Sequence, residues 1–129
     1  MTERDIEIRK LRPAISTIES GSEANPAEIF QNETLRPILK MQNELLLAVF
    51  RNYIEKRKGV FHGLITGAKM EYIEKSIRND QKFRNFLVGL ITGHFTLEEY
   101  TSFEKNTAEL TRRIVTMLTE RLQSQIDVF

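Results

Sequence analysis

The segment from Glu33 to Lys58 constrains the fold most, because its apolar residues cover more than one face of a helix. The first of its two stripes, with the spacing of a 3.6-residue turn, consists of Leu35, Ile38, Leu45 and Val49. The second stripe lies beside it and consists of Leu39, Leu46, Phe50 and Ile54. A helix that is apolar on two sides needs packing partners on both. We therefore predict that this segment is the buried central helix of a bundle.

The N-terminal residues predict a helix followed by a linker. Pro13 interrupts its apolar stripe, so the helix either kinks or begins there. Residues 20–25, SGSEAN, have the composition of a linker, which leaves room for a loosely docked N-terminal helix. We predict one domain over residues 1–129, with 1–25 as helix and linker and 26–129 as the core bundle.

Capping residues set the expected start and end of the helices near the central segment. Asparagine and proline at 25–26 predict the start of a short helix that ends near Gln31. Asn32 or Thr34 can cap the central helix, and Gly59 can end it. The apolar, glycine-rich sequence that follows fits an irregular connector.

Two further helices are predicted after the connector, over about 68–79 and from Asp80 to Gly93. Because a single capping residue joins them, they should lie antiparallel or cross at an angle. Gln42 lies on the apolar stripe of the central helix, where its buried amide favours a helix–helix hydrogen bond over a ligand contact. The whole pattern predicts an all-α, single-domain bundle of about five helices.

The last predicted helix begins at a capping box made by Thr96 and Glu99 and runs almost to Phe129. At 1.5 Å per residue, a helix over 97–125 spans roughly 43 Å, whereas a compact domain of this length has a diameter of about 36 Å. The helix should therefore extend beyond the core of its own domain, unless its end frays or it breaks near Thr119. We therefore predict a homodimer whose interface consists of Met117, Leu118, Leu122 and Ile126.

Composition narrows the classes of protein to which the chain can belong. The 129 residues are 40% hydrophobic and 29% charged, as in an ordinary globular domain. No apolar run approaches the roughly 20 residues of a membrane helix, so no membrane partner is expected. The absence of cysteine excludes thiolate chemistry, and with the charged N-terminus it favours the cytoplasm. Nineteen basic against eighteen acidic residues give no global field that would attract nucleic acid.

Two clusters are candidate sites. If the predicted helices alternate in direction, His62 and His94 meet at one end of the bundle, and the candidate metal site consists of His62, His94, Glu98 and Glu99. Basic residues surround the turn between two predicted helices, and the candidate nucleic-acid site consists of Lys75, Arg78, Lys82 and Arg84. Acidic partners neutralise half of this basic cluster, so nucleic-acid binding is not the favoured reading.

Three segments resemble a family of small, uncharacterised, all-helical bacterial proteins: residues 32–56, 73–100 and 120–126. The resemblance covers most of the chain from about residue 29 and implies an all-helical fold. Some members carry the label glyoxalase, but that superfamily is built of βαβββ units, and no such strands are predicted here. The resemblance therefore implies no chemistry.

The sequence favours a non-enzymatic helical interaction or regulatory protein that associates with itself and with another macromolecule. Whether the chain is an enzyme is left open with a preference against it, and no cofactor is expected. The alternatives are a nucleic-acid-binding regulator and a small metalloenzyme. The usual catalytic and phosphate-binding motifs, such as HExxH or a Walker loop, do not occur in the sequence.

Overall fold

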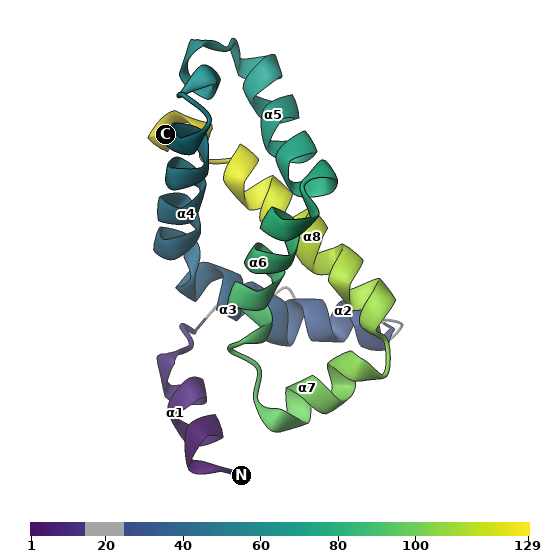
Figure 1. Cartoon of the computed structure of the whole chain (residues 1–129). Coiled ribbons are helices and arrows are strands. Elements are labelled where there is room, and N and C mark those ends of the chain that lie inside the picture. The colour runs from purple at the N-terminus through teal and green to yellow at the C-terminus, as the bar shows by residue number, and fades with distance from the viewer. Residues whose placement is uncertain (15–24) are drawn as a thin grey trace.

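The computed structural model describes residues 1–14 and 25–129, which form helices and no strand (Figure 1). The prediction of an all-α fold is confirmed. The elements are α1 (Glu3–Leu11), α2 (Pro26–Phe30), a π-helical segment (Gln31–Leu35), α3 (Arg36–Met41), α4 (Asn43–Lys56), a 3-10 turn (Val60–Gly63), α5 (Thr66–Asn79), α6 (Gln81–Thr92), α7 (Leu97–Glu104), α8 (Thr107–Gln123) and a second 3-10 turn (Ile126–Val128). None of the helices in these ranges has the length and apolar character of a membrane span.

Helix α2, the π-helical segment and α3 form one continuous helix, although the sequence predicted an end near Gln31. The amide of Arg36 donates to the carbonyl of Gln31, five residues earlier instead of four. Pro37 explains this wider turn, because proline has no amide hydrogen and its ring would clash with the Glu33 carbonyl in a regular α-helix.

Three of the predicted helix caps are confirmed. The side chains of Asn25, Asp80 and Thr96 each accept a hydrogen bond from the backbone amide three residues later. Asn32 and Thr34 lie within the continuous helix, so the prediction that one of them caps the central helix is wrong. Helix α1 ends at Leu11, before Pro13.

The predicted central helix bends at Gln42, where φ is −84° and ψ is 0°. Figure 1 shows that α3 and α4 consequently point in different directions. The change of direction takes Leu45 and Val49 of the first stripe out of the core: Leu45 is exposed and Val49 is half-buried. The second stripe is fully buried and consists of Leu39, Leu46, Phe50 and Ile54. The Gln42 amide donates to the Leu90 carbonyl at 2.8 Å, which confirms the predicted helix–helix hydrogen bond.

Helices α5 and α6 meet at an angle, and α6 continues in the general direction of α5 instead of folding back along it (Figure 1). Asp80 between them has an extended backbone, with φ −94° and ψ 94°. The connector between α4 and α5 and the turn between α6 and α7 therefore lie at opposite ends. Gly59 ends α4 as predicted, in the left-handed conformation with φ +64°.

An aromatic cluster around α4 forms one part of the core. The Phe50 ring, which is fully buried, lies 5.9 Å from the ring of Phe61 and 5.0 Å from that of Phe129. Phe61 thus packs into the core from the connector between α4 and α5. The C-terminal residue packs back onto α4 instead of extending into solvent.

The last predicted helix is two helices. Helix α7 ends at Glu104, and α8 begins at Thr107. Asn106 is non-helical, with φ −147° and ψ 47°. The Thr107 hydroxyl donates to carbonyls of the last turn of α7, which a helix end otherwise leaves unsatisfied. The prediction of one helix from Leu97 almost to Phe129 is therefore wrong.

This break removes the reason for placing a dimer interface on the C-terminal helix. Leu118 and Leu122 are fully buried within their own chain, and Met117 and Ile126 are partly buried against the same core. Helix α8 packs on α5, α6 and the π-helical segment. Contrary to the prediction, it therefore does not extend beyond the domain. Formation of a homodimer itself stays a prediction.

Candidate binding groove between α2 and α7

Helix α1 is held against the turn between α6 and α7 by charged and polar contacts. The Arg4 guanidinium donates to the carbonyls of Phe95 at 2.9 Å and Gly93 at 3.0 Å. The Asp5 carboxylate accepts a hydrogen bond from the Leu97 amide at 3.2 Å. These contacts satisfy carbonyl groups after the end of α6 and an amide at the start of α7. Helix termini leave such backbone groups without a partner inside the helix.

A buried ion pair continues this contact. Arg12 donates to both carboxylate oxygens of Glu99 at 2.5 Å, and the two side chains are only 10% and 11% exposed. Arg12 also donates to the carbonyl of His94 at 2.7 Å. Glu99 accepts further hydrogen bonds from the Thr96 amide at 2.8 Å and the Thr34 hydroxyl at 3.2 Å. One carboxylate thus ties α1, the π-helical segment and α7 together.

The surroundings of Glu99 keep it ionised. Burial alone would raise the pKa of this carboxyl group. The hydrogen bonds from Arg12, the Thr96 backbone and Thr34, together with the Arg12 charge, outweigh burial and hold the pKa below its ordinary value. Because four donors occupy the carboxylate, it is poorly placed to accept a proton from a substrate. The arrangement suits binding better than acid–base chemistry.

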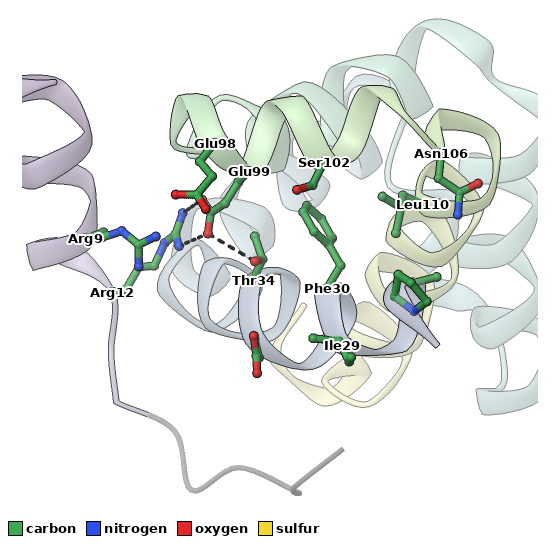
Figure 2. Close-up of a pocket in the computed structure, with 13 residues that line it drawn as sticks. Arg9, Arg12, Ile29, Phe30, Thr34, Glu98, Glu99, Ser102, Asn106 and Leu110 are labelled. Carbon is green, nitrogen blue, oxygen red and sulfur yellow. Dashed lines mark hydrogen bonds and ion pairs between the residues drawn. The ribbon is translucent and has the colours of Figure 1, made fainter. Parts of the chain in front are cut away.

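A cavity of about 430 Å³ lies between α2 and α7, beside this ion pair (Figure 2). We call this cavity the α2–α7 groove. Phe30 and Leu110, both buried, give it apolar walls. One rim consists of Glu98 and Ser102 on α7 and Asn106 in the break between α7 and α8. The opposite rim comes from α2 and the π-helical segment: Pro26, Ile29 and Glu33.

Charge is concentrated at the α1 end of the groove. Figure 2 shows Arg9 and Arg12 together there, with Glu98 and Glu99 facing them from α7. Glu99 neutralises Arg12, whereas the Arg9 guanidinium makes no ion pair or side-chain hydrogen bond with the part of the chain that the structure describes. The groove therefore carries charges of both signs next to an apolar wall: two arginines, Arg9 and Arg12, and three carboxylates, Glu33, Glu98 and Glu99.

Sequence reasoning identified only part of this site. Glu99 was recognised as a capping residue, but its partner Arg12 lies 87 positions away, and no local pattern connects the two. The π-helical segment that supplies Thr34 and Glu33 was also missed. The available signal was Pro37, a proline too far inside a helix to be accommodated without a local distortion.

The candidate metal site does not form. His62 lies in the turn between α4 and α5, with Nε2 2.7 Å from a carboxylate oxygen of Glu55. His94 lies in the turn between α6 and α7. Figure 1 shows this turn at the end of the molecule opposite the connector between α4 and α5, because α5 and α6 do not reverse the chain direction. The prediction that His62 shares an end with His94, Glu98 and Glu99 is therefore wrong. Residues 1–14 and 25–129 contain no group of three or more potential ligands suited to a metal ion.

The basic cluster on α5 and α6 is largely engaged within the protein. Lys75 and Arg78 each form an ion pair with the glutamate four residues earlier, at 2.7 and 2.6 Å. Arg84 donates to the carbonyl of Arg78 at 2.9 Å, and Lys82 is exposed. The acidic partners expected from the sequence are thus present. Nucleic-acid binding is not tested by these contacts and stays a prediction.

Comparison with known proteins gives no match: no protein-family model fits the sequence, and no curated protein or solved structure is similar to the chain. The family resemblance of the three segments is neither supported nor contradicted by this result.

Proposed function

We propose that the protein is a non-enzymatic interaction protein and that the α2–α7 groove binds an apolar segment of a partner protein. The observation that carries the proposal is the juxtaposition of apolar walls with polar and charged rims. Protein interfaces characteristically combine a desolvated apolar centre with a polar rim. The charges of both signs on the rims, Arg9 on one side and Glu33 and Glu98 on the others, favour a partner that carries both basic and acidic residues around its apolar anchor.

The groove is also prepared for binding by the contacts around it. The buried pair of Arg12 and Glu99 fixes α1, the π-helical segment and α7 in place before a partner arrives. A preformed site loses less conformational entropy on binding than a flexible one. We propose the same reducing cytoplasmic setting as the sequence indicated, because the chain has no cysteine.

Site-specific photocrosslinking in cells of the source organism tests the proposal. A photoreactive residue replaces Ser102, which is exposed on the α7 rim, so that it captures a protein bound in the groove. Ala27→Leu fills the groove, because Ala27 lines it and is only 7% exposed. We expect Ala27→Leu to abolish capture.

Ala48→Leu is the matched control, since Ala48 is exposed on α4 and the same atoms are added there. This variant should capture the partner as the unmodified groove does. Capture that survives Ala27→Leu in a folded protein would contradict the proposal. Equal loss in both variants would also count against it, because the effect would then not arise from the groove.

We propose self-association as a second activity, through α4 and α6 instead of the C-terminal helix. The Gln42–Leu90 hydrogen bond and the stacked rings of Tyr53 and Phe83, 3.9 Å apart, place α4 and α6 side by side. Between these two contacts, an apolar residue on each helix remains exposed: Leu45 at 45% and Phe86 at 54%. A two-fold dimer would cover both residues on each chain.

Light scattering at micromolar concentration tests this dimer. The expected mass is twice the 15.1 kDa of one chain, and Phe86→Glu should reduce it to that of one chain. Ile65→Glu is the control, because Ile65 is 80% exposed in the connector between α4 and α5. A wild-type mass of one chain would refute self-association.

A further inference from the structure

A second cavity lies where α8 contacts the π-helical segment, and its hydrogen-bonding groups are unbalanced. Its volume is about 350 Å³. Arg36 from α3 and Arg121 from α8 both line it, together with the Gln31 amide. Neither arginine forms an ion pair with any residue in 1–14 or 25–129. Two guanidinium groups that pair with no carboxylate in the described part of the chain thus share one cavity.

The Arg121 guanidinium is only partly exposed and has a neutral partner. It donates to the side-chain carbonyl of Asn43 at 3.3 Å, and burial lowers its pKa. A partly buried cation is costly unless an opposite charge compensates it. Asn43 does not depend on this contact, because its carbonyl also accepts from the Gln125 amide at 2.8 Å. The position of Arg121 is therefore better explained by a ligand than by its contribution to folding.

The other two polar groups also keep donors for a ligand. Arg36 uses Nε to donate to the Asn32 side chain at 2.9 Å, which leaves its two terminal nitrogens without a partner in the described structure. Arg113 donates to the side-chain carbonyl of Gln31 at 2.7 Å. This bond fixes the Gln31 amide so that its carbonyl is occupied and its NH₂ group remains available.

We propose that this cavity binds the phosphate group of a small phosphorylated molecule. Arg36 and Arg121 supply two positive charges, and Gln31 supplies a neutral donor. A phosphate is doubly charged near neutral pH and only accepts hydrogen bonds from its oxygens, which matches a cavity rich in donors. The planar guanidinium fork fits phosphate geometry, and a carboxylate would neutralise only one of the two arginines.

One acidic residue, Glu120, also lies at the rim of this cavity and is exposed. Its charge opposes an anionic ligand, so it provides a test with the opposite sign. Glu120→Gln should tighten phosphate binding, whereas Arg36→Gln and Arg121→Gln should weaken it. A generic salt effect on stability would not distinguish these variants.

The experiment is a calorimetric titration with inorganic phosphate at constant ionic strength. We expect Arg36→Gln and Arg121→Gln each to weaken binding by about tenfold or more, as for loss of a charge-assisted hydrogen bond. Arg112→Gln is the charge-matched control, because Arg112 lies on α8, as Arg121 does, and its side chain is 71% exposed. Equal affinity in all four proteins, or no binding to the wild type at millimolar phosphate, would overturn the proposal.

A second measurement separates binding from structural support. In phosphate-free buffer, Arg121→Met should keep or raise the melting temperature of the chain, because it removes an uncompensated cation. It should also abolish the rise in melting temperature that phosphate gives the wild type. A large loss of stability in Arg121→Met without phosphate would show that Arg121 serves the fold and would overturn the assignment.

Two further probes identify the source of the phosphate group. Glycerol 3-phosphate should bind at least as tightly as inorganic phosphate if the ligand is a small phosphate ester. Vesicles of phosphatidylglycerol in phosphatidylcholine present the same group on a membrane surface. Vesicle binding that free phosphate does not displace would refute a small-molecule site.

Discussion

The buried pair of Arg12 and Glu99 should couple α1 to the rest of the domain. Their side chains are 10% and 11% exposed, so neither charge is well solvated if the other is removed. Glu99→Ala should cost about 3–5 kcal/mol, because it strands the guanidinium and removes the capping box of α7. Arg12→Ala should cost less, about 1–3 kcal/mol, because α1 can detach and let water reach the carboxylate.

The two single variants and the double variant form a thermodynamic cycle. Urea denaturation followed by far-ultraviolet circular dichroism gives the free energy of unfolding of each protein. We expect a coupling free energy of about 1–3 kcal/mol, since the partners share one hydrogen-bond network. The control cycle uses Lys10 and Glu7, an ion pair whose side chains are 65% and 64% exposed, and its coupling should be close to zero. Equal coupling in the two cycles would refute the structural role given to the buried pair.

Two further predictions concern pH and the core. Burial and the charges of Arg12 and Arg4 lower the pKa of His94 below its ordinary value of 6.5. As the pH falls, the His94 imidazole is therefore protonated in the unfolded chain before it is protonated in the folded chain. Stability should therefore decrease below about pH 6.5, and thermal melts of His94→Gln should lack this decrease while those of His62→Gln retain it. Leu46→Ala should cost about 2–5 kcal/mol by urea denaturation, because Leu46 is fully buried, and a loss below about 1 kcal/mol would contradict its central position.

The sequence predicted the helical class and the helix starts because these depend on local chemistry. Capping by Asn25, Asp80 and Thr96 involves neighbours three residues away, and apolar periodicity shows which face of a helix is buried. The relative directions of the helices were harder to predict from the sequence. A single extended residue at Asp80 is compatible with a reversal or with a bend, and packing on α8 decides between them. The paired-histidine hypothesis failed at this step.

The groove could not be predicted for a related reason. Glu99 carried a local signal, whereas its contacts with Arg12 and Thr34 join segments 87 and 65 residues apart. Such contacts depend on where whole helices lie, which a capping pattern does not specify. The same holds for the second cavity, where Arg36 and Arg121 come from α3 and α8.

The π-helical segment connects both cavities, because it supplies Thr34 to the groove and Gln31 to the second cavity. A π-turn is an α-helix with one extra residue, so deleting the exposed Glu33 should restore regular geometry while keeping the flanking helices in register. Pro37 would then clash with the carbonyl four residues earlier, at a cost of about 3 kcal/mol.

Combining the Glu33 deletion with Pro37→Ala should therefore recover about 3 kcal/mol relative to the deletion alone. Pro37→Ala in the full-length chain should change stability by less than about 1 kcal/mol, because the wide turn already accommodates the ring. Urea denaturation of the four proteins measures each term. If Pro37→Ala stabilises the full-length and shortened chains equally, then the proline is not the reason for the π-turn, and the packing of α2 must impose it.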